Sequence, residues 1–117
     1  MDNPRKVTIV IPTYKNLKFL KTTVNSIFMT TDYCFSLLLV ICLEDKETLD
    51  WANQLKEAYE NVDYILSPKE GSIKALNQGI RWAIEQGAQD IYCTQDDVLF
   101  HPYRDWLRDY VAYSEKE

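Results

Sequence analysis

Short apolar runs alternate along the chain with longer segments in which apolar residues recur every three or four positions. The short runs are rich in valine, isoleucine and leucine, which is typical of strands buried on both faces of a sheet. We expect such strands at residues 7–11, 36–43, 62–66 and 90–94.

The segments between these runs have the spacing of amphipathic helices. One can be capped by Asn16, the next spans 47–59, and the third is stopped by Gly87. Their apolar positions are Leu17, Leu20, Val24, Ile27 and Phe28, then Leu49, Ala52, Leu55 and Tyr59, then Ile73, Leu76, Ile80, Ala83 and Ile84. A last helix is expected after Pro102, carrying Trp106, Leu107 and Val111, with Tyr110 near the same face.

Strict alternation of strand and helix predicts an α/β fold with a mostly parallel, Rossmann-like sheet and helices on both faces, a three-layer α/β/α sandwich. Asn77 and Gly79 have poor helix propensity, so we expect close packing or a side-chain hydrogen bond in the third helix. In such sheets ligands bind outside the carboxyl ends of the strands. The loops to inspect are therefore 12–16, 44–47, 67–74 and 95–101.

Length and charge narrow the possible functions. The 117 residues suit a single domain, expected over 1–117. A net charge of −5 argues against nucleic acid as the main partner, because binding to a phosphate backbone needs a basic footprint. No signal peptide is visible, and the longest apolar stretch, 35–43, is too short to span a bilayer, so we expect no membrane insertion.

The three cysteines show no CxxC pairing, which argues against a disulfide framework or a zinc site. Cys42 and Cys93 lie in apolar runs and are predicted to be buried core thiols. Reduced thiols fit a cytoplasmic protein. A sheet edge left incomplete could be covered by self-association, so a homo-oligomer is also considered.

The first two loops offer groups suited to a nucleotide. Pro12 ends a strand, Thr13 supplies a hydroxyl and Tyr14 a ring face for a flat base, although a turn followed by a helix cap explains the same residues. Glu44 or Asp45 can accept hydrogen bonds from a base or a ribose. The alternative is a solvated acidic turn that favours the dipole of the following helix.

The last two loops offer an anion site and a metal site. Gly71 opens a helix, whose free N–H groups attract anions, and Lys74 could add a cation. Asp96 and Asp97 repel one another at a strand end unless a hard cation such as Mg²⁺ or Mn²⁺ compensates them; an exposed acidic turn is the alternative. His101, the single histidine, fits a helix start better than a ligand or a catalytic group.

In this order and context, the motifs resemble those of family 2 glycosyltransferases, which have the GT-A fold. The resemblance runs from about residue 7 to residue 106. It is carried by Val10-Ile11-Pro12-Thr13-Tyr14, by Leu20 with Ser26-Ile27, by Glu44-Asp45, by Gly71, Ala75, Asn77 and Gly79, and by Gln95-Asp96-Asp97 with Val98 and His101-Pro102.

The resemblance implies a role for each matching position in a nucleotide-sugar site. Pro12, Thr13 and Tyr14 would line the pocket for the base. Glu44 or Asp45 would contact a uracil-like base or the ribose. The implied donor is a nucleotide-diphosphate sugar, with a UDP-sugar favoured and the acceptor unknown.

The implied phosphate and metal positions lie in the later loops. Gly71 and Lys74 would lie near the ribose or the phosphates. Asp97 matches the last acid of the family's Asp-x-Asp motif and would ligate Mn²⁺ or Mg²⁺. Gln95 replaces the first acid of that motif, and Asp96, facing the ribose or sugar, could take over its contact with the metal.

Two functions stay open. The first is a glycosyltransferase that transfers the sugar to an acceptor hydroxyl with help from a divalent metal. Family members usually continue into a second part that shapes the acceptor pocket and supplies the catalytic base of inverting enzymes, whereas nothing after Pro102 resembles such a base. The second is therefore a truncated or minimal GT-A module that binds the nucleotide sugar and needs a partner or further residues for transfer.

Overall fold

The computed structural model describes residues 5–31, 33–98, 107–108 and 111. Within them strands and helices alternate as the periodicity predicts, and the predicted strand ends differ from the observed ones by no more than two residues. The elements are β1 (Val7–Thr13), α1 (Leu17–Thr30), β2 (Ser36–Cys42), α2 (Lys46–Ala58), β3 (Val62–Ser67), α3 (Ser72–Glu85) and β4 (Asp90–Cys93).

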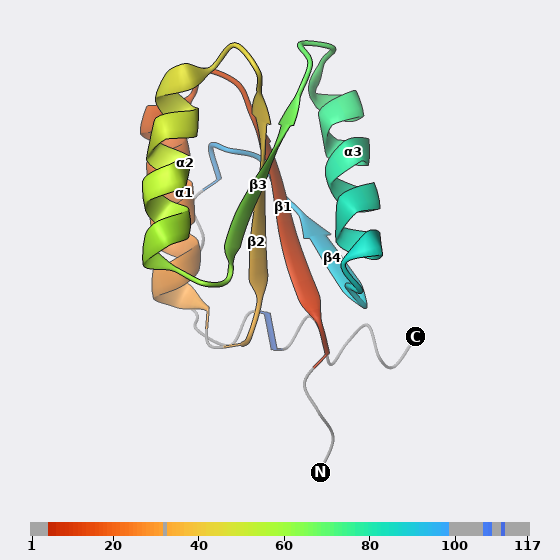
Figure 1. Ribbon diagram of the computed structural model, residues 1–117. Coiled ribbons are helices and arrows are strands. Elements are labelled where there is room, and N and C mark those ends of the chain that lie inside the picture. Colours follow the sequence, from red (N-terminus) through yellow and green to blue (C-terminus); the bar gives the residue numbers. More distant parts are fainter. Residues whose placement is uncertain (1–4, 32, 99–106, 109–110, 112–117) are drawn as a thin grey trace.

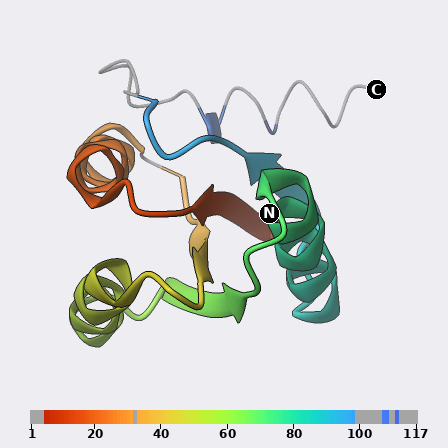
Figure 2. The same ribbon diagram turned by 90° about the horizontal axis from the view of Figure 1, so that it is seen from above.

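The sheet has the strand order β3-β2-β1-β4, and all three described strand pairs are parallel. β1 therefore lies between β2 and β4, with Ile9 opposite Leu37 on one side and Tyr92 on the other. Helices α1 and α2 cover one face of the sheet and α3 covers the other (Figures 1 and 2). The predicted three-layer α/β/α sandwich with a parallel sheet is confirmed.

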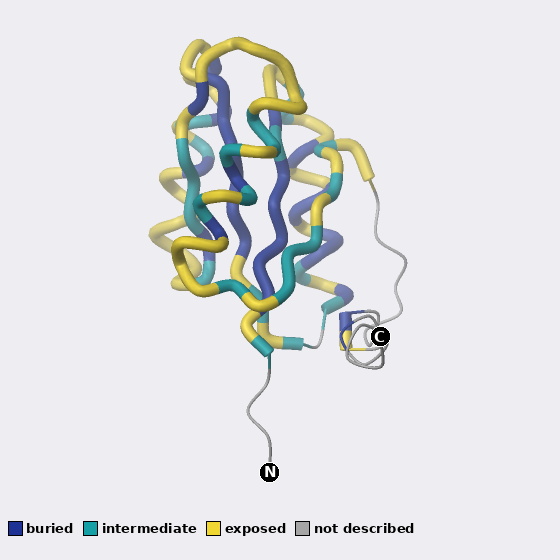
Figure 3. Tube along the Cα trace, turned by 90° about the vertical axis from the view of Figure 1, so that its right-hand side faces the viewer, coloured by how far each residue is buried: buried dark blue, intermediate teal, exposed yellow. Residues whose placement is uncertain are grey.

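Side-chain alternation along the two central strands divides the core between the faces of the sheet. The larger cluster, under α1 and α2, includes Val7, Ile9, Ile11, Leu37, Leu39 and Ile41. The smaller cluster, under α3, contains Val10, Leu38, Val40 and Ala83. Burial on both faces explains why these strands are almost continuously apolar, and Figure 3 shows the buried stretches running through the middle of the molecule.

α3 packs on the sheet through small residues. A Cβ atom on Gly79 would lie 2.6 Å from Val10 Cγ1 and 2.8 Å from Val40 Cγ2, so the helix backbone approaches β1 and β2 closely. This confirms the expectation of close packing at that glycine. The predicted apolar stripe is too wide, however, because Ile73 and Ile84 are 75% and 61% exposed.

Cys42, Cys93 and Tyr59 differ in how far they are buried. Cys42 is buried as predicted, but the prediction that Cys93 is a core thiol is wrong: β4 pairs with β1 alone among the described strands, and Cys93 is exposed. Tyr59 follows α2 as its C-cap and is 44% exposed, with its ring stacked on Phe28.

The predicted last helix lies mostly outside the described residues, as does His101. Leu107 and Val111, which are described, are helical and fully or almost fully buried in the larger core cluster. None of the helices in the described part of the chain is long and apolar enough to cross a membrane.

Candidate nucleotide-sugar site

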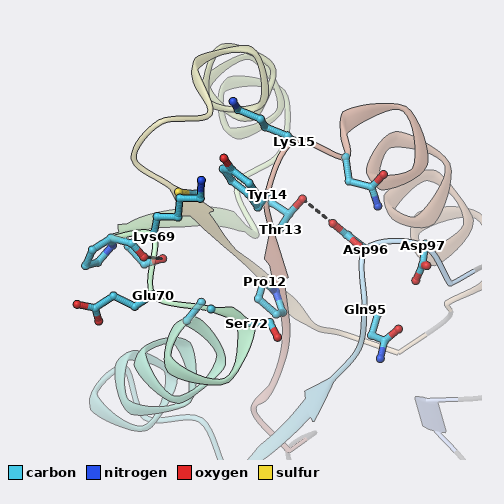
Figure 4. A pocket seen from close by; sticks show the side chains of 16 residues that line it. Pro12, Thr13, Tyr14, Lys15, Lys69, Glu70, Ser72, Gln95, Asp96 and Asp97 are labelled. Carbon is cyan, nitrogen blue, oxygen red and sulfur yellow. Dashed lines mark hydrogen bonds between the residues drawn. The ribbon is translucent and has the colours of Figure 1, made fainter.

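A cavity of about 700 Å³ lies at the carboxyl ends of the strands (Figure 4). Its walls come mainly from residues 12–16 at the end of β1, 67–72 at the end of β3 and 95–97 after β4, with Cys42 and Ala75 completing them. Three of the four loops singled out from the sequence thus meet at one place. The volume falls within the range of about 300–1,000 Å³ that is usual for small-molecule sites.

A hydrogen bond joins the last residue of β1 to the loop that follows β4. Thr13 Oγ1 donates to Asp96 Oδ2 over 2.8 Å, and Figure 4 shows the two side chains pointing toward one another. β1 and β4 are neighbours in the sheet, yet α1 after β1 and α3 before β4 lie on opposite faces. This is the switch point of the topology, where loops diverge and α/β proteins bind ligands.

Tyr14 forms the centre of a polar and aromatic cluster on the wall of the cavity. The Nζ atoms of Lys15 and Lys69 lie 5.4 and 5.2 Å from its ring centroid, and its hydroxyl donates to Glu44 Oε2 over 3.5 Å. The hydrogen-bonding interaction with Tyr14, and then the charges of Tyr14 and Glu44, raise the pKa of Lys69 above its ordinary value. Glu44 therefore reaches the cavity through Tyr14.

Asp45 is not among the residues that line this cavity and is only 4% exposed. Its Oδ2 accepts from the backbone N–H of Lys15 over 2.6 Å, and its Oδ1 accepts from the N–H of Thr48 over 3.3 Å. The second contact makes Asp45 the N-cap of α2. Both carboxylate oxygens are thus engaged with backbone groups.

The two site residues predicted near the start of α3, Gly71 and Lys74, line different hollows. Gly71 lines the cavity with φ +98°, a left-handed conformation that favours glycine, and it occupies the N-cap position of α3. Lys74, one turn into the helix, is exposed and pairs with Glu70 at 3.8 Å. It lines a smaller hollow of about 340 Å³ beside the main cavity.

The adjacent acids differ in their surroundings. Asp96 is half-buried and bonded to Thr13, whereas Asp97 is exposed at the rim and has no hydrogen bond or ion pair within the described part of the chain. Across residues 5–31, 33–98, 107–108 and 111, no three His, Cys, Asp or Glu side chains gather as a metal site. Any cation held here would need oxygen ligands from a bound molecule in addition to these carboxylates.

A family model described as "Glycosyl transferase family 2" matches residues 8–117. The chain belongs to this family. This membership agrees with the resemblance of the loop motifs.

Two solved structures have folds similar to that of the chain. The mannosyltransferase PcManGT from Pyrobaculum calidifontis, in complex with GDP-Man and Mn²⁺, superposes with a TM-score of 0.78 and 22% identity over 93% of this chain and 32% of that one. S. aureus TarS 1–349 in complex with UDP gives a TM-score of 0.73 and 18% identity over 95% of this chain and 32% of that one. The chain therefore has the GT-A fold.

One curated relative also matches. The uncharacterized protein y4gI of Sinorhizobium fredii (strain NBRC 101917 / NGR234) is 28% identical over 118 residues, which cover 99% of this chain and 13% of that protein. The family 2 chain thus spans about an eighth of this relative and about a third of the two enzyme structures.

Two lysine side chains of this site, Lys15 and Lys69, were not predicted from the sequence. Lys15 and Lys69 both line the cavity, and each lies over the Tyr14 ring. Both fall inside loops marked for inspection, and Lys69 directly follows the Ser67-Pro68 strand end. Because Lys15 and Lys69 are far apart in sequence, the sequence does not show that they approach the same ring. Their position in loops at strand ends is the signal that could have found them.

Proposed function

We propose that residues 1–117 form one domain that binds a nucleotide-diphosphate sugar, as the donor site of a glycosyltransferase that transfers the sugar to an acceptor hydroxyl. The observation that carries this proposal is the cavity at the switch point, closed on one side by the hydrogen bond between Thr13 and Asp96. The complexes of the fold relatives with GDP-Man and with UDP support a nucleotide ligand, and we favour a UDP-sugar.

The loops after β1 and β2 would hold the base. Pro12 and Thr13 line the cavity, and the Tyr14 ring offers an apolar face beside them. Glu44, bonded to the Tyr14 hydroxyl at the rim, would accept a hydrogen bond from the base or the ribose. Stacking on an aromatic ring suits any flat base, so the polar partner would set the choice among bases.

The side of the cavity formed by residues 67–72 would receive the phosphates. Lys69 brings positive charge there, Lys15 lies over the same Tyr14 ring as Lys69, and α3 begins directly after its N-cap Gly71. Helix N-termini and cations together attract an anion. Because the chain has a net charge of −5, an anionic ligand needs local positive charge of this kind.

Asp97 and Asp96 fit a divalent cation. Asp97 presents a carboxylate without a hydrogen bond or ion pair to any of the described residues, and Asp96 keeps Oδ1 beside the Oδ2 that Thr13 occupies. Mg²⁺ and Mn²⁺ prefer oxygen ligands, and Mg²⁺ is commonly held by one or two carboxylates together with substrate phosphates. When bound, the cation would act as a Lewis acid that neutralises charge on the departing diphosphate. Thr13 would fix the orientation of Asp96 throughout.

Titration calorimetry with UDP and GDP, with and without Mn²⁺, tests the binding proposal. We expect Mn²⁺-dependent binding that Asp97→Ala weakens about tenfold or more, equivalent to about 1.4 kcal/mol. Glu57→Ala, which removes an exposed acid near the far end of α2, is the matched control and should bind as the wild type does. Binding that survives both removal of the metal and Asp97→Ala would contradict the metal site.

The alternative is a module that binds the nucleotide sugar without transferring it. It gains support from the fact that the chain spans about a third of the two enzyme structures, so residues for transfer would lie elsewhere in a complete enzyme. Incubation of the chain with a UDP-sugar and Mn²⁺ separates the two. Release of UDP supports a transferase, whereas binding without release supports the module.

A further inference from the structure

Asp45 is a buried carboxylate that the proposed contacts with nucleotide and metal do not use. It is 4% exposed, and burial of a charge is costly unless other groups compensate it. Here two backbone N–H groups do so, that of Lys15 after β1 and that of Thr48 in the first turn of α2. One side chain thus joins the loops that follow two neighbouring strands.

Helix capping explains only one of these contacts. The bond to Thr48, at 3.3 Å, is the one that stabilises the start of α2, and the short side chain of a serine would serve that purpose equally well. The bond to Lys15 is much shorter, at 2.6 Å, and contributes nothing to the helix. The longer reach and the charge of aspartate therefore serve the hydrogen bond to Lys15, in the loop after β1.

The backbone of that loop is strained where Asp45 holds it. Lys15 has φ +48°, and among the described non-glycine residues it alone has a positive φ. A left-handed conformation is unfavourable for an ordinary L-residue and persists where its surroundings impose it. The N–H that Asp45 accepts belongs to the planar peptide between Tyr14 and Lys15, so holding it limits rotation on both sides of that peptide.

Tyr14 is placed by this peptide. Its side-chain contacts are weak by comparison, a 3.5 Å hydrogen bond to Glu44 and two cations more than 5 Å from its ring centroid. We infer that Asp45 is a positioning residue of the site, which holds the peptide between Tyr14 and Lys15 so that the Tyr14 ring stays on the cavity wall. The effect on ligand affinity rests on the proposed function, whereas the tether itself is a property of the free chain.

The variant Asp45→Ser separates the tether from the cap, because serine caps a helix but is too short to reach Lys15. Amide exchange followed by NMR on the 117-residue chain should be about tenfold faster or more at Lys15, with cross-peaks between Tyr14 and Lys69 lost. The melting temperature should change by no more than about 4 °C. The Kd for UDP or GDP with Mn²⁺ should rise about tenfold.

Two further variants sharpen the test. Glu47→Ser removes an exposed acid from the same helix turn and should leave exchange at Lys15, the Tyr14 cross-peaks and the Kd unchanged. Asp45→Asn keeps the reach of the side chain but replaces one of its two accepting oxygens by an NH₂ donor, so amide exchange should become faster at either Lys15 or Thr48. It also provides a comparison if the serine variant melts too early.

Slow exchange at Lys15 in folded Asp45→Ser, or unchanged cross-peaks between Tyr14 and Lys69, would overturn the inference. So would slow exchange at both Lys15 and Thr48 in a folded Asp45→Asn chain. If the wild type binds neither UDP nor GDP, the proposed function fails, yet exchange and cross-peaks in the free chain still decide whether Asp45 positions the loop.

Discussion

Replacing Gly79 by alanine tests how closely α3 approaches the sheet. The added Cβ would lie 2.6 Å from Val10 Cγ1 and 2.8 Å from Val40 Cγ2, about 1 Å closer than the optimum of about 3.5–4.0 Å between carbon atoms. Both valines are fully buried in the two central strands, so neither has space to move aside. The helix itself would have to shift away from the sheet.

Two opposing terms set the size of the effect. Alanine in place of glycine in a helix interior stabilises by about 0.5–1 kcal/mol, whereas overfilling a well-packed core costs about 1–3 kcal/mol. Because Gly79 meets close atoms on two strands, we expect the steric cost to exceed the gain and the free energy of unfolding to fall by about 1–2 kcal/mol. For a chain of this size the melting temperature should fall by about 4–8 °C.

Urea denaturation measures the change directly. Asn77→Ala is the matched control: it lies two residues away on the exposed side of the same helix, and it should be neutral or stabilise by up to about 0.7 kcal/mol through helix propensity. If Gly79→Ala is as stable as the wild type or more so, propensity outweighs the clash. The close approach of α3 to β1 and β2 would then be refuted.

Three other substitutions or treatments probe the site and the thiols. Thr13→Val, which loses the hydroxyl that bonds an acid of the metal pair, should cost about 1 kcal/mol of stability and weaken Mn²⁺-dependent nucleotide binding, whereas Thr13→Ser should retain both. Iodoacetamide at pH 7.5 should label Cys93 but not Cys42; labelling of Cys93, whose thiol pKa burial raises above 9.0, should accelerate with pH. The pKa of Lys69 is raised, so its contact with Tyr14 is complete below pH 10.5 and is lost as pH rises through the raised pKa. An NMR titration of Lys69 should have a midpoint above 10.5, and this midpoint should fall in Tyr14→Phe.

Most of the fold could be predicted because its signals are local. β1 and β2 are buried on both faces, so their runs are almost wholly apolar, and the helices between strands repeat their apolar residues at helical spacing. Alternation then leaves a parallel sheet as the expected arrangement. Even Gly79 was informative, since a residue of poor propensity in a helix interior has to be explained by packing.

Side-chain burial at the margins could not be predicted because it depends on what covers each element. Periodicity places Ile73 and Ile84 toward the apolar side of α3, but this helix contacts the sheet along a narrow line of small residues, where Gly79 and Ala83 are buried. Cys93 lies in an apolar run, yet its strand has a neighbour on one side only among the described strands. A local sequence pattern predicts neither how wide the contact between a helix and the sheet is nor where a strand lies in the sheet.

The site illustrates the same division between local and tertiary information. The rule that ligands bind at strand carboxyl ends selected the loops holding Thr13, Tyr14 and Asp96, because it depends only on the order of elements. It could not tell Glu44 from Asp45, since two adjacent acids after a strand look alike until the chain is folded. In the folded chain the two acids make different contacts. The carboxylate of Glu44 accepts from the Tyr14 hydroxyl, whereas that of Asp45 is buried and accepts from the peptide N–H that follows Tyr14. Both acids therefore act on the same ring, one from the solvent side and one from within, and removing either should disturb Tyr14 by a different route.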